Sequence, residues 1–192
     1  MQRLIAVWLI CALGGTAPIL ADEPGRDRIN PELTALLKRA ANEADGFDDP
    51  FDAEVWLTDM SGRLARKIPD DRTRVELLRH VHHEATRAGV KPELVLAVIE
   101  VESDFDPYAI SRAGARGLMQ VMPFWLEEIG RPGDSLFRVQ TNLRYGCTIL
   151  KYYLDKEQGD LTRALARYNG SVGRWVYPNK VYQAFNRRWY PQ

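Results

Sequence analysis

This sequence contains very little cysteine and has no excess of positive or negative charge. Its 192 residues include only two cysteines, Cys11 and Cys147. Cys11 lies in an N-terminal segment that we expect to be removed, so the mature chain would keep one thiol and could form no disulfide within itself. We expect Cys147 to be a buried thiol in a helix. The 26 Lys and Arg residues balance 26 Asp and Glu residues. Since nucleic-acid-binding domains usually carry a basic excess, this balance argues against nucleic acid as a partner.

Strand-like alternation of any length, internal repeats and low-complexity segments are also absent from the sequence. The composition, 45% hydrophobic and 27% charged, is ordinary for a soluble globular protein. A chain of this length can form one domain with a proper core and an extension. Because apolar residues recur at helical spacing, we predict a mainly α protein, a single globular helical domain with an N-terminal helical extension.

Residues 1–21 have the features of a secretory signal peptide. Arg3 supplies a positive charge, residues 4–13 form an apolar core, and Ala21 ends the segment at a suitable cleavage point. An uncleaved membrane anchor is the alternative, although the apolar run is short for a membrane span. We therefore expect export to the periplasm or cell wall, with no integral membrane span after processing.

The rest of the chain divides into a linker and helical extension over residues 22–68 and a domain over residues 69–192. The extension would contain two helices. Capping residues, glycines and apolar spacing predict six helices in the domain. The eight predicted helices cover residues 30–41, 52–66, 70–89, 92–102, 123–129, 139–156, 160–168 and 178–188. A small hairpin could occupy residues 109–118.

The first helix of the domain carries three histidines. Its apolar spacing predicts a core face that includes Val75 and Leu78. The histidines would lie on the opposite, polar face. We favour a solvated face for His80, His82 and His83 over a metal-binding pair formed by His80 and His83.

The helix that begins at Pro92 places a carboxyl group where its apolar pattern requires a core residue. The pattern is formed by four aliphatic residues, Leu94, Val95, Val98 and Ile99. Continuing by three and four residues brings the same stripe to Glu102. Desolvation would raise the pKa of this carboxyl group, and the negative end of the helix dipole would act in the same direction. A carboxyl group that keeps its proton near neutral pH is suited to general-acid catalysis.

The alternative for Glu102 is a carboxylate at a frayed helix end, in water. Glu100 shares a helix face with Glu93, seven residues earlier. We therefore expect Glu100 to be the more solvated of the two carboxyl groups near the end of this helix.

The segment from Glu102 to Pro123 contains many positions of a known pattern. It reads E-S-x-F from residue 102, has a serine at 111, and reads G-A-x-G-L-M-Q-x-M-P over residues 114–123. This segment resembles the catalytic signature of lytic transglycosylases of the soluble-lytic-transglycosylase type, within the lysozyme superfamily. The resemblance implies a lysozyme-like α+β fold for the domain.

A looser match follows at residues 167–170, Arg-Tyr-Asn-Gly. The family usually continues Tyr-Asn with Ala-Gly-Pro-Gly, whereas residues 170–173 of this chain are Gly-Ser-Val-Gly. This departure leaves the path of the backbone after Asn169 open.

The resemblance implies a reaction that uses one catalytic carboxyl group and no metal or cofactor. Glu102 would protonate the glycosidic oxygen between N-acetylmuramic acid and N-acetylglucosamine. It would then accept the proton of the muramic 6-hydroxyl, which attacks C1, so the product carries a 1,6-anhydro ring and no water is consumed. An aligned internal nucleophile can have an effective molarity of about 10⁵ M or more, enough to compete with water.

The resemblance also implies substrate-binding roles for the residues at matching positions. Ser111 would lie near the N-acetyl group, Gln120 and Met122 would line sugar subsites, and Tyr168 would form a hydrogen bond near the acid, followed by Asn169.

Aromatic residues that could stack on sugar rings form a separate group. Among them we select Tyr182 as a substrate-binding residue. We assign the others to packing, namely Trp125, Trp175, Tyr177 and Trp189.

Two other functions are compatible with the same substrate. A hydrolytic muramidase would need a second carboxylate facing Glu102, and no candidate stands out in the sequence. A non-catalytic peptidoglycan-binding protein would need no acid at all. In each case we expect the partner to be peptidoglycan glycan strands and the protein to be a monomer.

Overall fold

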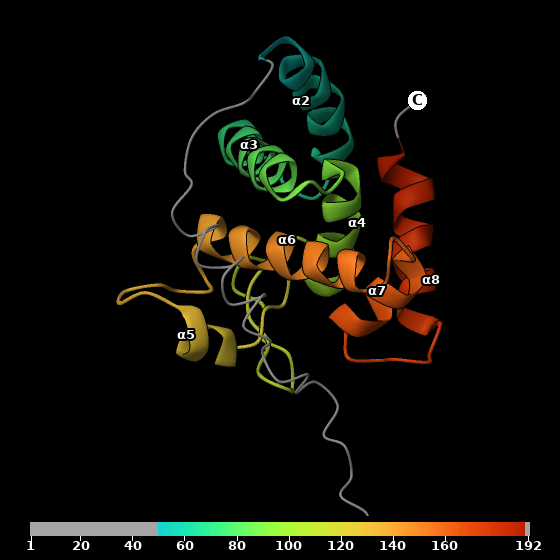
Figure 1. The fold of residues 1–192 in the computed structure, drawn as a ribbon. Helices are drawn as coiled ribbons and strands as arrows, with labels where there is room; N and C mark the ends of the chain where they lie inside the picture. Colours follow the sequence, from blue (N-terminus) through green and yellow to red (C-terminus); the bar gives the residue numbers. More distant parts are fainter. Residues whose placement is uncertain (1–49, 191–192) are drawn as a thin grey trace, which may run out of the picture.

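The computed structural model describes residues 50–190, and the predicted signal peptide and the predicted helix at 30–41 lie outside this range. The described chain forms seven α-helices and one π-helix (Figure 1). They are α2 (Pro50–Leu64), α3 (Asp71–Ala88), α4 (Pro92–Ser103), α5 (Phe124–Ile129), α6 (Val139–Lys156), α7 (Leu161–Tyr168), α8 (Val176–Ala184) and η1 (Phe185–Trp189). Between residues 50 and 190 the β structure is limited to isolated antiparallel bridges. The prediction of a mainly helical domain is confirmed.

Local sequence signals explain several helix boundaries. The Asp70 side chain accepts a hydrogen bond from the Thr73 amide at 2.8 Å at the start of α3. Asp160 accepts one from the Arg163 amide at 3.0 Å at the start of α7. Both contacts satisfy amide groups that lack a partner in the first turn of a helix. Gly89 ends α3 with a φ of 69°, a conformation that glycine adopts without steric cost.

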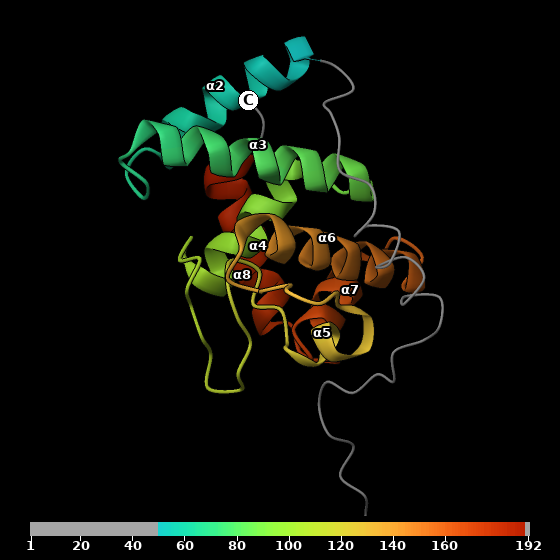
Figure 2. The same ribbon diagram turned by 90° about the vertical axis from the view of Figure 1, so that its left-hand side faces the viewer.

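Helix α4 lies at the centre of the fold. It contacts α3 on one side and α8 and η1 on another, and Figure 2 shows it among these helices. Residues 95–99 are fully buried, including Leu96 and Ala97, which lie outside the predicted apolar stripe. A helix that is apolar on all sides is typical of a core position. The residues of the predicted apolar stripe are therefore buried, and the buried surface of α4 is wider than that stripe.

Glu100 is predicted to be more solvated than Glu102, and the fold nevertheless covers most of its side chain. Its side chain is 19% exposed and accepts a hydrogen bond from Trp189 Nε1 at 2.7 Å. Glu93 is buried on the same face and accepts a hydrogen bond from Trp56 Nε1 at 2.7 Å. The cause is tertiary, because η1 and α2 cover this polar face of α4 from distant parts of the chain.

Helix α2 packs against α3 and η1 and supplies Met60 and Leu64 to the same core. Arg63 of α2 donates a hydrogen bond to the Arg188 carbonyl at 2.8 Å. The His82 ring of α3 lies against the Trp56 ring, with 5.0 Å between centroids. The histidine-bearing face of α3 is therefore partly covered by α2, which corrects the prediction of a solvated face.

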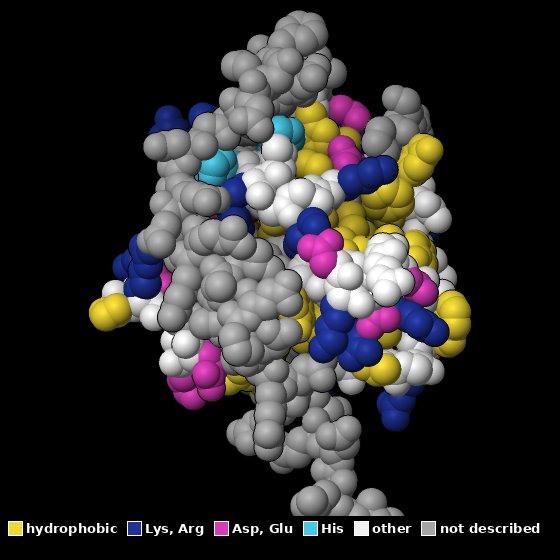
Figure 3. Space-filling view, viewed as in Figure 1, with side chains coloured by type: hydrophobic (Ala, Val, Ile, Leu, Met, Phe, Trp, Pro, Cys, Tyr) yellow, Lys and Arg dark blue, Asp and Glu magenta, His cyan; other side chains and the backbone are white. Residues whose placement is uncertain are grey.

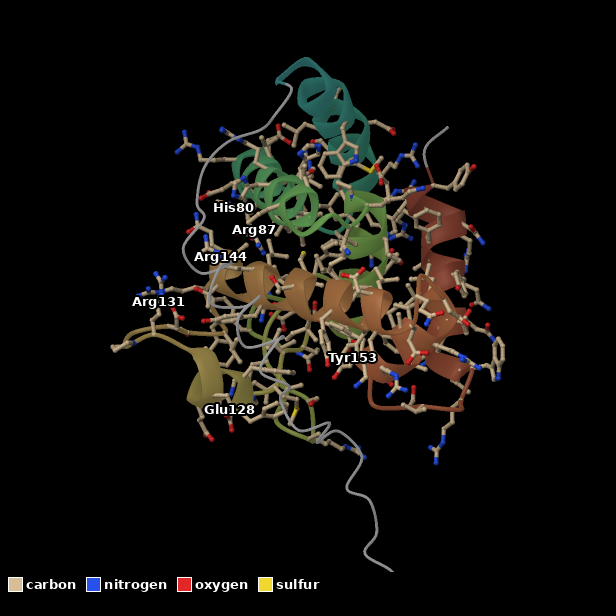
Figure 4. The ribbon with its side chains drawn as sticks, in the orientation of Figure 1. His80, Arg87, Glu128, Arg131, Arg144 and Tyr153 are labelled. Carbon is tan, nitrogen blue, oxygen red and sulfur yellow. The ribbon has the colours of Figure 1, made fainter. Side chains whose placement is uncertain are left out.

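Helices α3 and α6 pack side by side around a buried charge cluster, in which Arg87 and Arg144 lie close together (Figure 4). Glu84 of α3 is only 2% exposed. It accepts hydrogen bonds from Arg87 Nε at 2.6 Å and from Arg144 Nε of α6 at 3.2 Å. Two cations therefore compensate the buried carboxylate, as burial of a charge requires.

This buried charge also explains an error in the predicted core face of α3. Val75 is 38% exposed, whereas Leu77 is buried. The buried face of α3 includes the charged residues Arg74 and Glu84, which a hydrophobic pattern does not count. The buried face of α3 is therefore centred on other residues than those predicted, and Val75 lies outside it.

Cys147 of α6 is fully buried, as predicted. Its Sγ lies 4.0 Å from Met119 Sδ, and burial raises the pKa of the thiol. Cys147 is therefore a protonated packing residue of the core.

Candidate active site

Glu102 lies in the last turn of α4, half-buried at the point where the chain leaves the core. Asp104 and Phe105 follow with φ values of 51° and 72°, and this left-handed pair ends the helix abruptly. Such conformations are unfavourable for residues other than glycine. Phe105 is buried and packs on the Trp189 ring at 5.6 Å between centroids, which offsets that cost and fixes the direction of the chain beyond Glu102.

A buried tyrosine is the hydrogen-bond partner of Glu102. The Tyr177 hydroxyl of α8 donates to Glu102 Oε1 at 2.6 Å. From the sequence, Tyr177 is assigned to packing together with the other aromatic residues outside Tyr182. A signal was available, since a buried tyrosine needs a partner for its hydroxyl and a carboxyl group in an apolar stripe needs a donor. The two residues are 75 positions apart, so the sequence could not show that they meet.

The surroundings of Glu102 favour its protonated form. Burial raises the pKa of Glu102 from an ordinary value of 4.5 to about 7, although the hydrogen bond from Tyr177 acts in the opposite direction. Burial, followed by the charge of Glu102, also holds the pKa of Tyr177 well above its usual range. Near neutral pH, Glu102 can therefore donate a proton or accept one, while Tyr177 remains a neutral donor.

The loop after α4 folds back on itself below the helices (Figure 2). Antiparallel bridges join Ile110 with Arg116 and Arg116 with Val121, which agrees with the hairpin considered at residues 109–118. The Ser103 hydroxyl, at the end of α4, donates to the Leu118 carbonyl at 2.8 Å. Ser103, the residue next to Glu102, therefore holds the segment of the loop that returns toward α4.

Asn142 of α6 anchors this loop from the other side. It is 1% exposed. Its Oδ1 accepts from the Met119 amide at 2.8 Å, and its Nδ2 donates to the carbonyls of Arg116 at 2.8 Å and Leu136 at 2.9 Å. Sequence reasoning missed Asn142, although a polar residue on the buried face of a helix is a signal in itself, because it must find partners.

Two glycines allow the loop to approach α6 closely. Gly117 has a φ of 74°, and a Cβ there would lie 2.4 Å from both Asn142 Nδ2 and the Leu136 carbonyl oxygen. At Gly146 of α6, a Cβ would lie 2.4 Å from Met119 Sδ. The backbone of the G-L-M-Q segment is therefore held against α6 by contacts that only glycine permits.

The polar residues that the resemblance assigned to sugar binding also support the loop. Gln120 has a φ of 49°, and its Nε2 donates to the carbonyls of Ala109 at 3.1 Å and Gly117 at 2.9 Å. Ser111 is exposed, and its hydroxyl accepts from the Ala115 amide at 3.0 Å. Their contacts in the structure are thus within the loop, and their roles toward sugar stay predictions.

Tyr168 lies near Glu102 but does not bond to it directly. Its hydroxyl donates to the Met119 carbonyl at 2.8 Å. Burial raises the pKa of Tyr168, and the nearby charge of Glu102 adds to this effect. The structure therefore brings Glu102, Tyr168, Tyr177 and the Met119 backbone into one neighbourhood.

The other three predicted residues form no hydrogen bond with Glu102 in the described part of the chain. Met122 is half-buried against the core. Asn169 is exposed and caps the C-terminus of α7. Tyr182 of α8 is half-buried, with its hydroxyl 2.9 Å from Thr162 Oγ1. Substrate contacts by these residues stay predictions.

In this helical domain one carboxyl group has a pKa near neutral pH and accepts a hydrogen bond from a neutral hydroxyl group. Such a pair of groups can carry out acid–base catalysis. The family model for the transglycosylase SLT domain matches residues 80–188. This match covers more than half of the chain and includes the whole Glu102 neighbourhood. The chain belongs to the transglycosylase SLT domain family.

Curated relatives carry names that agree with this family. The chain is 36% identical over 109 residues to membrane-bound lytic murein transglycosylase C of Yersinia pestis (strain Pestoides F) and of Yersinia pseudotuberculosis (serotype O:1b, strain IP 31758). Each match covers 48% of this chain and 30% of the relative. The chain thus spans less than a third of the length of these relatives.

A solved structure is also similar, the crystal structure of the 70 kDa soluble lytic transglycosylase of Escherichia coli. The TM-score is 0.43 at 23% identity, over 79% of this chain and 26% of that chain. Among the helices between residues 50 and 190, none has both the length and the apolar character needed to cross a bilayer.

Proposed function

We propose that this protein is a lytic murein transglycosylase. It cleaves the β-1,4 bond between N-acetylmuramic acid and N-acetylglucosamine in peptidoglycan and leaves a 1,6-anhydro end on the muramic sugar. The observation that carries the proposal is the Glu102 carboxyl group, whose pKa is raised to about 7, within a domain of the SLT family.

In the first step Glu102 donates its proton to the glycosidic oxygen as the bond from that oxygen to C1 breaks. The N-acetyl group of the muramic sugar stabilises the positive charge that develops at C1. In the second step the 6-hydroxyl oxygen bonds to C1 and gives its proton to the Glu102 carboxylate. Glu102 ends in its starting state and no water enters the product, so a single carboxyl group is sufficient.

A group that serves first as acid and then as base works best when its pKa lies near the pH of the reaction. The raised pKa of Glu102 supports this double role. Because Tyr177 donates to Oε1, we assign the proton transfers to Oε2. Tyr177 also limits the rise in the pKa, since its hydrogen bond favours the carboxylate that must form in the first step.

The remaining assignments complete the proposal. Ser111, Gln120, Met122, Tyr168, Asn169 and Tyr182 contact the glycan strand. The signal-peptide pattern of residues 1–21 supports export to the periplasm or cell wall, and the names of the relatives, which call them membrane-bound, are compatible with an extracytoplasmic site of action.

The test is the mass of the products released from purified peptidoglycan sacculi. Anhydro-muropeptides are the expected products. Products heavier by one water would identify a hydrolytic muramidase and overturn the non-hydrolytic mechanism. Binding of sacculi without any release, equal for wild type and Glu102→Gln, would identify a binding protein instead.

A further inference from the structure

The segment from α2 to the turn that follows it reaches both ends of α4. Near the start of α4, Trp56 Nε1 donates a hydrogen bond to Glu93 Oε1 at 2.7 Å. At the end of α4, Lys67 Nζ donates one to the Asp104 carboxylate. The residues of each pair are 37 positions apart, so the two segments run in the same direction and stay in register. Because the family match begins at residue 80, this segment lies outside it.

Lys67 reaches the residue that ends the helix of Glu102. Asp104 is the C-cap of α4, with a φ of 51°, and its amide donates to the Glu100 carbonyl at 3.2 Å. A left-handed backbone is unfavourable for a residue with a side chain, and it persists where surrounding contacts hold it. Asp104 follows Glu102 by two positions. Its conformation therefore sets the direction of the last turn of α4, from which the Glu102 side chain projects.

The next residue, Phe105, contacts the same lysine. Its φ is 72° and its side chain is buried. Lys67 Nζ lies over the Phe105 ring, 6.0 Å from its centre, and the Trp189 ring lies 5.6 Å away between centroids. A cation over an aromatic face at such a distance is attracted to it. One lysine therefore contacts both of the left-handed residues that follow Glu102.

Helix α2 also holds η1, which carries Trp189. Arg63 of α2 donates to the carbonyls of Arg188 at 2.8 Å and Tyr190 at 2.9 Å, on either side of Trp189 in the chain. Figure 3 shows cationic, acidic and hydrophobic side chains mixed on the surface where α2 meets η1. Through Arg63, α2 acts by a second route on the chain that follows Glu102.

We propose that Lys67 is a positioning residue for Glu102, and that the segment from α2 to Lys67 orients the end of α4 for catalysis. Lys67 acts through Asp104 and Phe105, which it holds in their left-handed conformations. The inference rests on the proposed function, because it takes Glu102 as the group that transfers protons. It gives a catalytic purpose to a segment that the family match does not include.

The contact of Lys67 with Asp104 should affect orientation more than stability. The Asp104 side chain is 68% exposed and that of Lys67 is 20% exposed, and ion pairs at the surface contribute little to the free energy of unfolding. Displacement of reacting groups by about 1 Å, by contrast, can lower a rate by about 10²-fold. Loss of the contact should therefore lower kcat and leave the urea midpoint of the fold almost unchanged.

The first arm of the test measures release of anhydro products from soluble peptidoglycan strands by Lys67→Met. We expect kcat to fall at least about tenfold with KM unchanged, because the residues assigned to the glycan strand are intact. Lys151→Met is the matched control, since it breaks a lysine–aspartate pair of the α6 surface, and it should keep the wild-type kcat. Lys67→Arg, which can still pair with Asp104, should retain most of the activity. Equal kcat for Lys67→Met and Lys151→Met would overturn the proposal.

The second arm asks whether Lys67 acts through Asp104. Asparagine tolerates the left-handed conformation, so Asp104→Asn changes the charge and keeps the backbone. Asp104→Asn alone should lower kcat, since a neutral amide binds an ammonium group more weakly than a carboxylate does. Added to Lys67→Met, it should cause no further fall, because the partner is already absent. Falls that multiply would show that the two residues act separately, against the proposal.

The pH profile separates positioning from a direct effect of charge. Removal of a positive charge near Glu102 would raise the pKa of its carboxyl group and move the alkaline limb of kcat/KM upward. A loosened helix end instead admits water to Glu102, so the limb of Lys67→Met should move downward by roughly half a pH unit or more. The groups that face Glu102 from α7 and α8, Tyr168 and Tyr177, are the same in both chains. A limb that stays in place or moves upward would overturn the proposal.

Infrared spectroscopy of the Glu102 carboxyl group distinguishes failure of this inference from failure of the proposed function. The band of the protonated carboxyl group, identified by its loss in Glu102→Gln, gives a titration midpoint without any substrate. A lower midpoint in Lys67→Met than in wild type and Lys151→Met supports the positioning role, even if the wild type releases no anhydro product and the proposed function fails. Equal midpoints in the three chains refute the positioning role, and an active wild type then leaves the transglycosylase standing.

Discussion

Glu84 and Glu102 are two carboxyl groups withdrawn from water, and they differ in what they face. Glu84 accepts hydrogen bonds from two arginines, Arg87 and Arg144. Glu102 accepts one from the neutral Tyr177 hydroxyl and, in the described part of the chain, takes part in no ion pair. Cations stabilise the charged form of a buried carboxyl group, whereas a neutral donor leaves it close to protonation. The comparison separates a structural carboxylate from one that can transfer protons.

The largest effect that would test this comparison is the loss of catalysis in Glu102→Gln. The substitution preserves the shape of the side chain and removes its transferable proton, so we expect the rate of anhydro-muropeptide release to fall by roughly 10²–10⁴-fold. Chromatography of digested sacculi measures the rate. Glu76→Gln, at a well-exposed position of α3, is the matched control and should keep the wild-type rate. A Glu102→Gln chain with full activity would remove the basis of the distinction.

The converse substitution should affect stability instead. Glu84→Gln leaves Arg87 and Arg144 without their carboxylate, and loss of one partner of a buried ion pair costs about 3–5 kcal/mol. Urea denaturation at neutral pH measures the loss, with Glu76→Gln again as control. If Glu84→Gln is as stable as the control, Glu84 is not the structural carboxylate described above.

The free energy of unfolding should depend on pH through the titration of Glu102. Its folded pKa, about 7, lies above its ordinary value of 4.5, so the folded chain binds the proton more tightly than the unfolded chain. Raising the pH from about 4.5 to about 7 therefore costs the wild type stability relative to Glu102→Gln, by up to about 3 kcal/mol. Denaturation of both chains across this range gives the difference. A constant difference would show that the Glu102 carboxyl group titrates as it does in the unfolded chain.

The smallest expected effect concerns Tyr177. Its hydrogen bond favours the carboxylate form of Glu102, so Tyr177→Phe should raise the pKa of Glu102 further. We expect the alkaline limb of the rate profile to move upward by roughly one pH unit, because a hydrogen bond to a charged group contributes about 1.5–3 kcal/mol. Tyr190→Phe, at an exposed tyrosine, should leave the profile unchanged. A downward shift in Tyr177→Phe would contradict the assigned direction.

The position of Glu102 could be predicted because its information is local. The aliphatic spacing of α4 and the helix-ending residues after it lie within a few positions of the carboxyl group, and burial of that stripe is what raises its pKa. Capping by Asp70 and Asp160 was predictable for the same reason. Helical periodicity and capping act over one or two turns of chain.

The partners of these groups could not be predicted, because they come from distant segments. Tyr177 reaches Glu102 across 75 positions, and Trp189 reaches Glu100 across 89. Asn142 holds the Met119 amide from a separate helix. Such contacts depend on how the helices pack, which the pattern of a single helix does not specify. The cover over Glu100 has this origin, since its own helix gives no sign of η1.

Because Gly146 has no side chain, the residues that can stand at positions 146 and 119 depend on each other. The Met119 thioether fills the space that a methyl group at residue 146 would need, and the carbonyl of Met119 receives the Tyr168 hydroxyl. A bulkier residue in the helix would displace the thioether and, with it, the backbone to which Tyr168 is fastened. A larger residue at position 146 can therefore be accommodated only if residue 119 becomes smaller.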